Sequence, residues 1–274
     1  MTIEAVLQRL VLSSPDPARL ADFYERAFDY RVSKADGDHR CQGSERSLWI
    51  RPGPANQLIE SHFALADAAA VERYASGLAA RGVAIERRAG AVWAVQDLEG
   101  RKICFAACAA LEEDPHARAA AAPPARLQHY AVRTPAPGAL VEFYTERLGF
   151  TCSDLVHDEA GELTAAFLRT DAEHHALAIF RAPERRFDHF SCETPSWIGL
   201  RDWADFLAQR AVRLAWGIGR HGPGNDTFFM VLDPDGNLAE ISAELEICPD
   251  TRPVGRWQHA METLNQWGVA IMRS

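Results

Sequence analysis

Residues Gly217–Glu244 have the sequence GIGRHGPGNDTFFMVLDPDGNLAEISAE, which combines a glycine-rich loop, two apolar runs and a tight turn. His221 lies in the loop, and the apolar run Phe228–Leu232 predicts a strand. In the turn Asp233–Asn237, proline fixes φ and glycine adopts positive φ, which predicts a hairpin. Glu240 lies in its second strand. Because a buried carboxylate is costly unless it is paired or bound to a metal, Glu240 is expected at a solvent-facing edge or in a metal site.

The chain carries an internal repeat. Leu7 begins LQRLVLSSPDPARLADFYERAFDYRV and Leu127 begins LQHYAVRTPAPGALVEFYTERLGFTC, and the two segments align without a gap. Each copy predicts a strand and then a helix that starts at a proline, Pro17 or Pro137, where the missing N–H is harmless. Apolar side chains at i, i+3, i+4 and i+7 predict that one face of each helix packs inward. A repeat this long indicates a duplicated module rather than a solenoid.

Later segments of the two copies also correspond. They are the His-Phe segments 59–66 and 187–194, the helices expected at 68–81 and 196–210, and the hairpins expected at 92–107 and 228–243. Each copy is therefore a strand, a helix, two or more strands, a second helix and a hairpin. This order predicts an α+β fold built from two modules.

We expect the repeat to divide the chain into four parts: an N-terminal domain without metal ligands at 1–110, an alanine- and proline-rich linker at 111–126, a C-terminal metal-binding domain at 127–246 and a tail at 247–274. The tail contains Trp257, Leu264 and Trp267. Because two exposed tryptophans would be unusual, the tail is expected to pack on the second module or on a neighbouring subunit.

The composition narrows the class of protein. The chain has 274 residues, of which 47% are hydrophobic and 24% charged, and a net charge of −9. This charge argues against nucleic acid or an anionic membrane as a partner. The sequence has no apolar run long enough to span a membrane and no signal-peptide pattern at its start. The six cysteines lack CxxC spacing, so we expect reduced thiols in a cytoplasmic protein.

Three potential metal ligands lie on three different strands of the second copy: His129, His189 and Glu240. Each histidine alone would be expected as a hydrogen-bonded core residue, and Glu240 alone as a rim carboxylate. Together they are two imidazoles and one carboxylate from one module, the facial set that holds Fe(II) and leaves positions open for substrate and O₂.

The first copy serves as an internal comparison. By sequence, the matching positions there are Arg9, His62 and Cys104. Arginine has no lone pair available for a divalent metal, so the first copy is expected to be metal-free.

The segment around His221 resembles the signature of the type I extradiol dioxygenases, in the vicinal oxygen chelate superfamily. That signature is a glycine-flanked His, an apolar residue followed by Tyr, then Asp-Pro-x-Gly and a Glu. Met230 stands where the family has its Tyr. The resemblance covers most of the chain, most closely Leu127–Glu246. It implies two tandem vicinal oxygen chelate domains, each a pair of βαβββ units forming a half-open barrel.

By this resemblance His129, His189 and Glu240 match the family's iron ligands, so Fe(II) is expected rather than Mn(II). His175 and His221 match the family's other two site histidines, and Met230 takes the place of a residue that reaches the substrate. The implied substrates are a small aromatic diol and O₂, and a homo-oligomer is expected.

Three neighbouring side chains are expected outside the chemistry. His174 alternates to the face opposite His175 and is expected to be structural or solvated. Asp188 and Glu193 could orient the ligands, but we expect them at the solvated rim.

Two other functions remain open. One is a non-oxidative superfamily member, such as a glyoxalase-type lyase or isomerase, that uses Zn, Ni or Mn as a Lewis acid. The other is a protein that binds a small aromatic molecule without chemistry. Ligands drawn from a single module favour the dioxygenase, because the non-oxidative relatives commonly take ligands from two modules.

Overall fold

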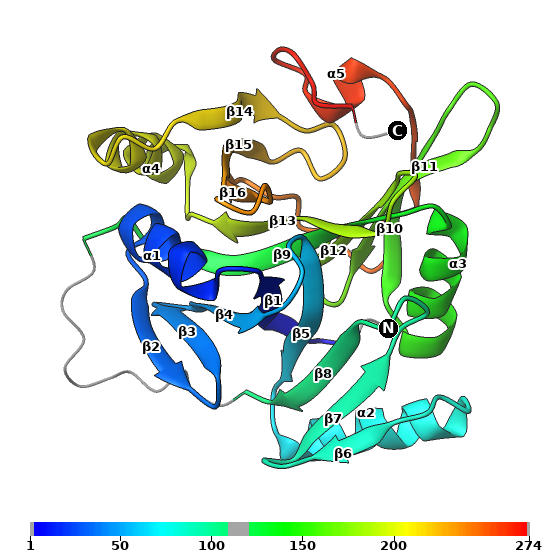
Figure 1. Cartoon of the computed structure of the whole chain (residues 1–274). Helices are drawn as coiled ribbons and strands as arrows, with labels where there is room; N and C mark the ends of the chain where they lie inside the picture. Colours follow the sequence, from blue (N-terminus) through cyan, green and yellow to red (C-terminus); the bar gives the residue numbers. More distant parts are fainter. Residues whose placement is uncertain (1–2, 109–120, 273–274) are drawn as a thin grey trace.

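The computed structural model describes residues 3–108 and 121–272, and Figure 1 shows them as two stacked groups of strands with helices packed outside. The linker expected at 111–126 lies mostly outside these residues, and its last residue, Arg126, already belongs to a strand. Within the described ranges, none of the helices has both the length and the apolar character needed to cross a membrane.

The first module consists of two βαβββ units placed side by side. The first unit is β1 (Val6–Ser14), α1 (Pro17–Phe28), β2 (Arg31–Ala35), β3 (Asp38–Gly43) and β4 (Arg46–Pro52). The second unit is β5 (Gln57–Leu65), α2 (Ala68–Ala80), β6 (Glu86–Arg88), β7 (Val92–Gln96) and β8 (Lys102–Ala107). The strand order is β2-β3-β4-β1-β5-β8-β7-β6, so the antiparallel pair β1 and β5 joins the units.

The second module repeats this plan. Its first unit is β9 (Arg126–Thr134), α3 (Pro137–Glu142), the π-helix η1 (Phe143–Leu148), β10 (Thr151–His157), β11 (Leu163–Arg169) and β12 (Leu177–Arg181). Its second unit is β13 (Arg186–Glu193), α4 (Trp197–Gln209), β14 (Leu214–Arg220), β15 (Thr227–Leu232) and β16 (Leu238–Ala243). The predicted fold class is confirmed: with β17 (Gly255–Gln258) from the tail, the sheet runs β14-β15-β16-β13-β9-β12-β11-β10-β17.

The helices at the start of the two modules differ at their ends. In α1, Asp16 caps the N-terminus by accepting a hydrogen bond from the Arg19 amide, and the apolar stripe is buried as predicted. The matching segment of the second module is not one α-helix. It changes at Phe143 to the wider π-helix, and the hydroxyl of Thr145 bonds the Val141 carbonyl within the helix.

Two tyrosine hydrogen bonds join the modules symmetrically. The hydroxyl of Tyr24 donates to Asp233 in the β15–β16 turn at 2.8 Å, and the hydroxyl of Tyr144 donates to Asp97 in the β7–β8 turn at 3.2 Å. Each tyrosine is fully buried in a core cluster shared by both modules. The hairpin that carries Glu240 is therefore fixed at its turn by the other module.

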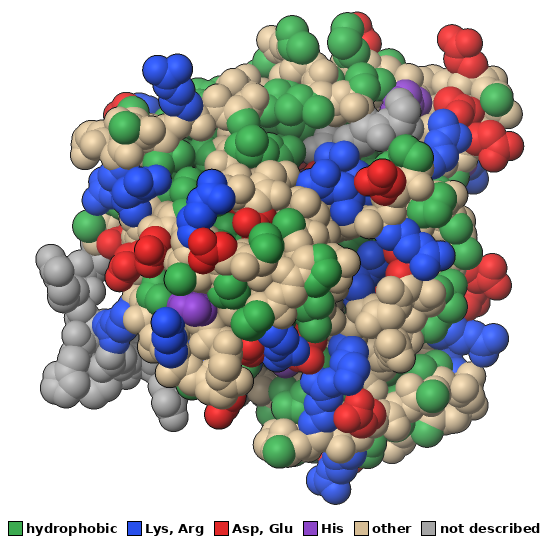
Figure 2. All heavy atoms as spheres, viewed as in Figure 1, with side chains coloured by type: hydrophobic (Ala, Val, Ile, Leu, Met, Phe, Trp, Pro, Cys, Tyr) green, Lys and Arg blue, Asp and Glu red, His purple; other side chains and the backbone are tan. Residues whose placement is uncertain are grey.

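The tail packs on the second module. Its strand β17 (Gly255–Gln258) extends the sheet beside β10, and Leu264 of α5 (Met261–Leu264) is buried. Trp257 is half-buried, whereas Trp267 remains 51% exposed, against the expectation, and contacts Trp197 edge to face. On the face shown in Figure 2, acidic and basic side chains are interspersed, so this face carries no continuous field of one sign.

Candidate metal centre

Strand register brings the three candidate ligands to one face of the second sheet. On the central strand β13, Ser191 pairs with His129 of β9 on one side and with Glu240 of β16 on the other. His189 precedes Ser191 by two residues, and residues two apart on a strand point to the same face. The three side chains therefore converge, although they lie far apart in the sequence.

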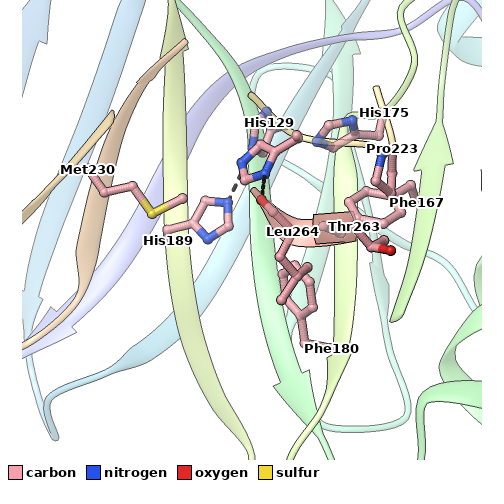
Figure 3. A pocket seen from close by; sticks show the side chains of 11 residues that line it. His129, Phe167, His175, Phe180, His189, Pro223, Met230, Thr263 and Leu264 are labelled. Atoms are coloured by element: carbon pink, nitrogen blue, oxygen red, sulfur yellow. Dashed lines mark hydrogen bonds between the residues drawn. The ribbon is translucent and has the colours of Figure 1, made fainter. Parts of the chain in front are cut away.

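The ligand atoms face one another inside the protein. The Nε2 atoms of His129 and His189 are 3.2 Å apart, and Nε2 of His129 lies 3.7 Å from Oε1 of Glu240. All three side chains are buried, and one ligand atom from each lies within 4.8 Å of the others. Figure 3 shows the two imidazoles pointing toward each other at the pocket.

The hydrogen bonds of the two histidines place the single hydrogen of each neutral ring on Nδ1, so that Nε2 is the lone-pair atom. The Nδ1 of His129 contacts the amide oxygen of Gln128, and Nδ1 of His189 lies 2.6 Å from Oδ1 of Asp188. Both partner oxygens are acceptors, so Nδ1 carries the hydrogen in each ring. Burial lowers the pKa of His129 to about 3, which keeps that ring neutral and its Nε2 lone pair available. Two such lone pairs at 3.2 Å repel unless a cation lies between them.

Glu240 supplies the negative charge. Both of its oxygens are fully buried and have no hydrogen-bond partner among the described residues. Burial would raise the pKa of Glu240, but the contact with His221 outweighs it, so the pKa lies below its usual value. An ionised buried carboxylate without a hydrogen bond is costly, and a divalent cation on two imidazoles would compensate that cost. These residues therefore fit a metal.

The neighbours of the ligands correct one expectation. Asp188 is not at the solvated rim: it is buried, binds His189 and is paired with Arg133. Glu193 pairs with Arg126 and with the Leu245 amide, and no contact joins it to a ligand. The sequence analysis had not identified Gln128, which holds His129, although glutamine recurs at this position of the repeat.

The five histidines of this region separate into distinct environments. His175 lines the pocket, and burial holds its pKa well below the usual value, so the ring is neutral. His174 is fully buried beside it, with its Nδ1 3.0 Å from Nδ1 of His175 and its Nε2 3.1 Å from Asp154. It is structural rather than solvated, and it contacts the pocket histidine directly.

His221 is the half-buried histidine at the pocket mouth. Its Nδ1 donates to the Leu264 carbonyl at 2.6 Å, its ring stacks on Phe228, and its Nε2 lies 3.7 Å from Glu240. Burial would lower the pKa of His221, but the carboxylates of Asp226 and Glu240 outweigh it and raise the pKa. Asp226, which the sequence analysis had not identified, is fully buried. Burial raises the pKa of Asp226 to about 7.

The pocket is apolar beyond the histidines. Its lining includes Phe167, Phe180 and Met230, together with Thr263 and Leu264 from the tail. Met230 is fully buried and pairs with Glu240 across β15 and β16, so its side chain lies beside the candidate ligand. The free space is about 20 Å³, which accommodates about one water molecule. An aromatic ring can enter only if side chains or the tail move.

The first module has a different counterpart of this site. Glu60 pairs with Val11 as His189 pairs with Ala131, so Glu60, not His62, takes the place of His189. Matching the two His-Phe segments in the sequence paired His62 with His189, which is wrong by two residues, because Glu60 is the structural equivalent. Glu60, His62 and Cys104 also lie close together, but Glu60 already binds His62 at 2.9 Å and Arg88 at 3.1 Å. In the first module the positive charge of Arg88 thus balances the carboxylate, as a metal cation would.

Comparison with known families covers both modules. Residues 126–241 match the Glyoxalase/Bleomycin resistance protein/Dioxygenase superfamily, and residues 9–106 match a glyoxalase-like domain. The two matches together cover most of the chain, and the predicted resemblance to the type I extradiol dioxygenases is confirmed by its relatives.

Two curated relatives illustrate the likeness. Metapyrocatechase 2 of Cupriavidus necator is 31% identical over 150 residues, 54% of this chain and 46% of that protein. The match thus spans less than half the length of that relative. The 3-methylcatechol 2,3-dioxygenase of Pseudomonas putida is 24% identical over 76% of this chain and 78% of that protein.

Solved structures share the fold. Homoprotocatechuate 2,3-dioxygenase from Arthrobacter globiformis superimposes with a TM-score of 0.78 at 22% identity, covering 97% of this chain and 88% of that chain. The Mn(II)-bound glyoxalase from Novosphingobium aromaticivorans superimposes with a TM-score of 0.76 at 20% identity, covering 98% of this chain and 92% of that chain.

Proposed function

We propose that this protein is an extradiol dioxygenase that cleaves a catecholic ring beside its two hydroxyls, with Fe(II) held by His129, His189 and Glu240. One observation carries the proposal: two facing imidazole Nε2 atoms and a buried carboxylate without a hydrogen bond meet beside an apolar pocket. When bound, Fe(II) would supply open positions for the diol and O₂ and an electronic route between them.

The remaining histidines supply proton handling. A diol that binds as an anion must lose a proton to a base inside the pocket. His175 is neutral and buried, so one of its nitrogens can accept that proton. His221 has a raised pKa and lies near Glu240, so it can carry a proton and donate it to developing negative charge on the substrate.

The apolar lining favours an aromatic substrate over a polar one. Phe167 and Phe180 offer ring edges and faces, and Met230 offers a soft contact without a hydrogen-bond donor. Met230, which stands where the related dioxygenases have a tyrosine, therefore supplies no acid or base. We propose that His175 and His221 suffice, and that Met230 makes the substrate pocket more apolar.

A second candidate is a glyoxalase-type lyase or isomerase. It is favoured by the fold shared with the Mn(II)-bound glyoxalase, and by Met230 in place of a tyrosine. A non-oxidative reaction would consume no O₂, so the two candidates separate in one assay.

The test is to load the protein with Fe(II) under anaerobic conditions, then add a panel of catechols and O₂. The proposal predicts O₂ consumption in equal amount to a coloured ring-opened product, and no turnover in a His129→Ala control. Turnover of a hemithioacetal without O₂ uptake, with catechols untouched, would instead establish the glyoxalase-type reaction.

A further inference from the structure

A chain of three buried side chains leads from β10 to the pocket. The Nε2 of His174 lies 3.1 Å from Oδ2 of Asp154, and Nδ1 of His174 lies 3.0 Å from Nδ1 of His175. Asp154 and His174 are fully buried, and His175 lines the pocket. Neither Asp154 nor His174 is among the candidate metal ligands, so the reaction proposed above leaves this chain without a role.

The far end of the chain is anchored as an ionised carboxylate. Arg252 donates to Oδ1 of Asp154 at 2.8 Å, and the indole of Trp257 donates to Oδ2 at 2.7 Å. Burial would raise the pKa of Asp154, but its contacts with His174 and Arg252 outweigh burial and lower the pKa. The contact between His174 Nε2 and Asp154 Oδ2 is a 3.1 Å ion-pair contact that does not meet the geometry of a hydrogen bond. Because an ionised carboxylate only accepts hydrogen bonds, the hydrogen of a neutral His174 belongs on this Nε2.

This anchor determines which nitrogen of each ring is bare. A neutral His174 with hydrogen on Nε2 has a lone pair on Nδ1. Only one hydrogen fits between the two Nδ1 atoms, and in this tautomer of His174 it is His175 that donates it. With its Nδ1 committed, His175 has only Nε2 left for the pocket, and that atom is free of hydrogen.

We propose that Asp154 and His174 are positioning residues that hold His175 as the Nδ1–H tautomer and so present its bare Nε2 to the pocket as a proton acceptor. The inference rests on the proposed function only for the identity of the proton donor, a substrate hydroxyl. In that step the O–H bond breaks, the oxygen keeps the electron pair, and the new bond is N–H on Nε2.

The surroundings of His174 accommodate this arrangement. Gly224, in the loop that carries His221, has a φ of +80°, and a Cβ there would lie 3.1 Å from Nδ1 of His174. The first module has no equivalent: the registers of β4 on β1 and β12 on β9 place Glu45 and Arg46 at these positions. The paired histidines thus occur in the module that holds the candidate ligands.

The experiment compares His174→Gln with His174→Leu. Glutamine can donate to Asp154 and accept from His175, whereas leucine can do neither. Imidazole ¹⁵N spectra of the metal-free proteins, with His175 assigned from a His175→Gln sample, report its tautomer without any need for activity. We expect hydrogen on Nδ1 of His175 in the parent and in His174→Gln, and a mixture of tautomers in His174→Leu.

Kinetics of the Fe(II)-loaded variants give the second readout. His174→Leu should lower kcat by about 10- to 100-fold with KM and iron content unchanged, while His174→Gln stays near the parent. His39→Leu, at a half-buried histidine of the first module, is the matched control for loss of an imidazole. Asp154→Leu gives a second route to the same tautomer mixture if His174→Leu does not fold.

Three results would overturn the inference. They are hydrogen on Nε2 of His175 in the parent, an unchanged tautomer in both His174→Leu and Asp154→Leu, and an equal loss of kcat in the Gln and Leu variants. If no catechol is turned over at all, the proposed function fails, yet the tautomer in the metal-free protein still decides this inference.

Discussion

Glu60 of the first module occupies the position that His189 occupies in the second, because each residue pairs across its sheet with the equivalent residue of the neighbouring strand. The carboxylate there is neutralised by Arg88, with Arg51 3.8 Å away, and is hydrogen-bonded to His62. The two modules thus share one backbone plan. In the first module arginine side chains balance the charge of the carboxylate, and in the second a cation is proposed for the equivalent place.

The ion pairs of Glu60 should make stability depend on pH. The hydrogen bond from His62 lowers the pKa of Glu60, and so does the contact with Arg88. Together they outweigh the effect of burial and bring the pKa from 4.5 to about 2. Because the pKa of Glu60 is lower in the folded than in the unfolded protein, its ionised form stabilises the folded protein at pH values above the unfolded-state pKa. This stabilisation is lost as the pH falls from about 4.5 to about 2. Denaturant unfolding should show Glu60→Gln to be less stable by up to about 3 kcal/mol at pH 7, with the difference vanishing near pH 2. Glu146→Gln, on the exposed face of η1, is the control. A difference that is constant with pH would contradict the assignment.

Asp188 should tune the metal through His189. Replacing it by Asn keeps an acceptor for Nδ1–H but removes the buried charge beside it. We expect metal affinity in Asp188→Asn to fall by about 10- to 100-fold, measured by competition with a chelator. Glu193→Gln should match the parent, because Glu193 pairs with Arg126 and not with a ligand. Equal affinities for all three proteins would show that Asp188 serves folding alone.

His221 should affect turnover but not metal binding. We expect His221→Ala to retain its iron and to lose about 10²-fold in kcat, the scale of an acid–base group. His157→Ala, a half-buried histidine of β10, is the control. Unchanged turnover on the preferred catechol would reduce His221 to a residue that fastens the Leu264 carbonyl.

Met230 should influence substrate preference. Met230→Tyr adds a hydroxyl beside Glu240 and is expected to alter kcat or the ranking of catechols, with iron content unchanged. Leu232→Tyr is the matched control, since Leu232 follows on the same strand face but is 54% exposed. If both variants behave like the parent across several catechols, position 230 does not face the chemistry.

The repeat and the hydrophobic spacing were sufficient to predict the duplicated α+β fold, because both are local patterns. Three candidate ligands could be predicted because each is a metal-binding residue type in an apolar strand. The equivalence of Glu60 with His189 could not be predicted, because strand register depends on pairing between distant segments. The His-Phe pair common to both copies also suggested a different match, between His62 and His189.

The partners of the site residues were also beyond local patterns. Gln128 and Asp188 precede the histidines that they hold, but in an ideal strand adjacent side chains point to opposite faces, so alternation alone places them elsewhere. The pairing of β13 with β9, the strands that carry Asp188 and Gln128, has register irregularities near both residues. Asp154 and Leu264 reach the site only through tertiary packing, from segments that carry no signature of their own. Asp226 lies within the signature segment, but at a position for which the signature specifies no residue.

The central claim is that the second module binds one divalent metal through His129, His189 and Glu240 while the first module binds none. The most direct measurement is metal content by mass spectrometry after anaerobic Fe(II) loading and removal of free metal. We expect about one iron per chain in the parent and in the His62→Ala/Cys104→Ala double variant, and almost none in His129→Ala, His189→Ala or Glu240→Ala. Full occupancy in His129→Ala, or loss of iron in the double variant, would contradict it.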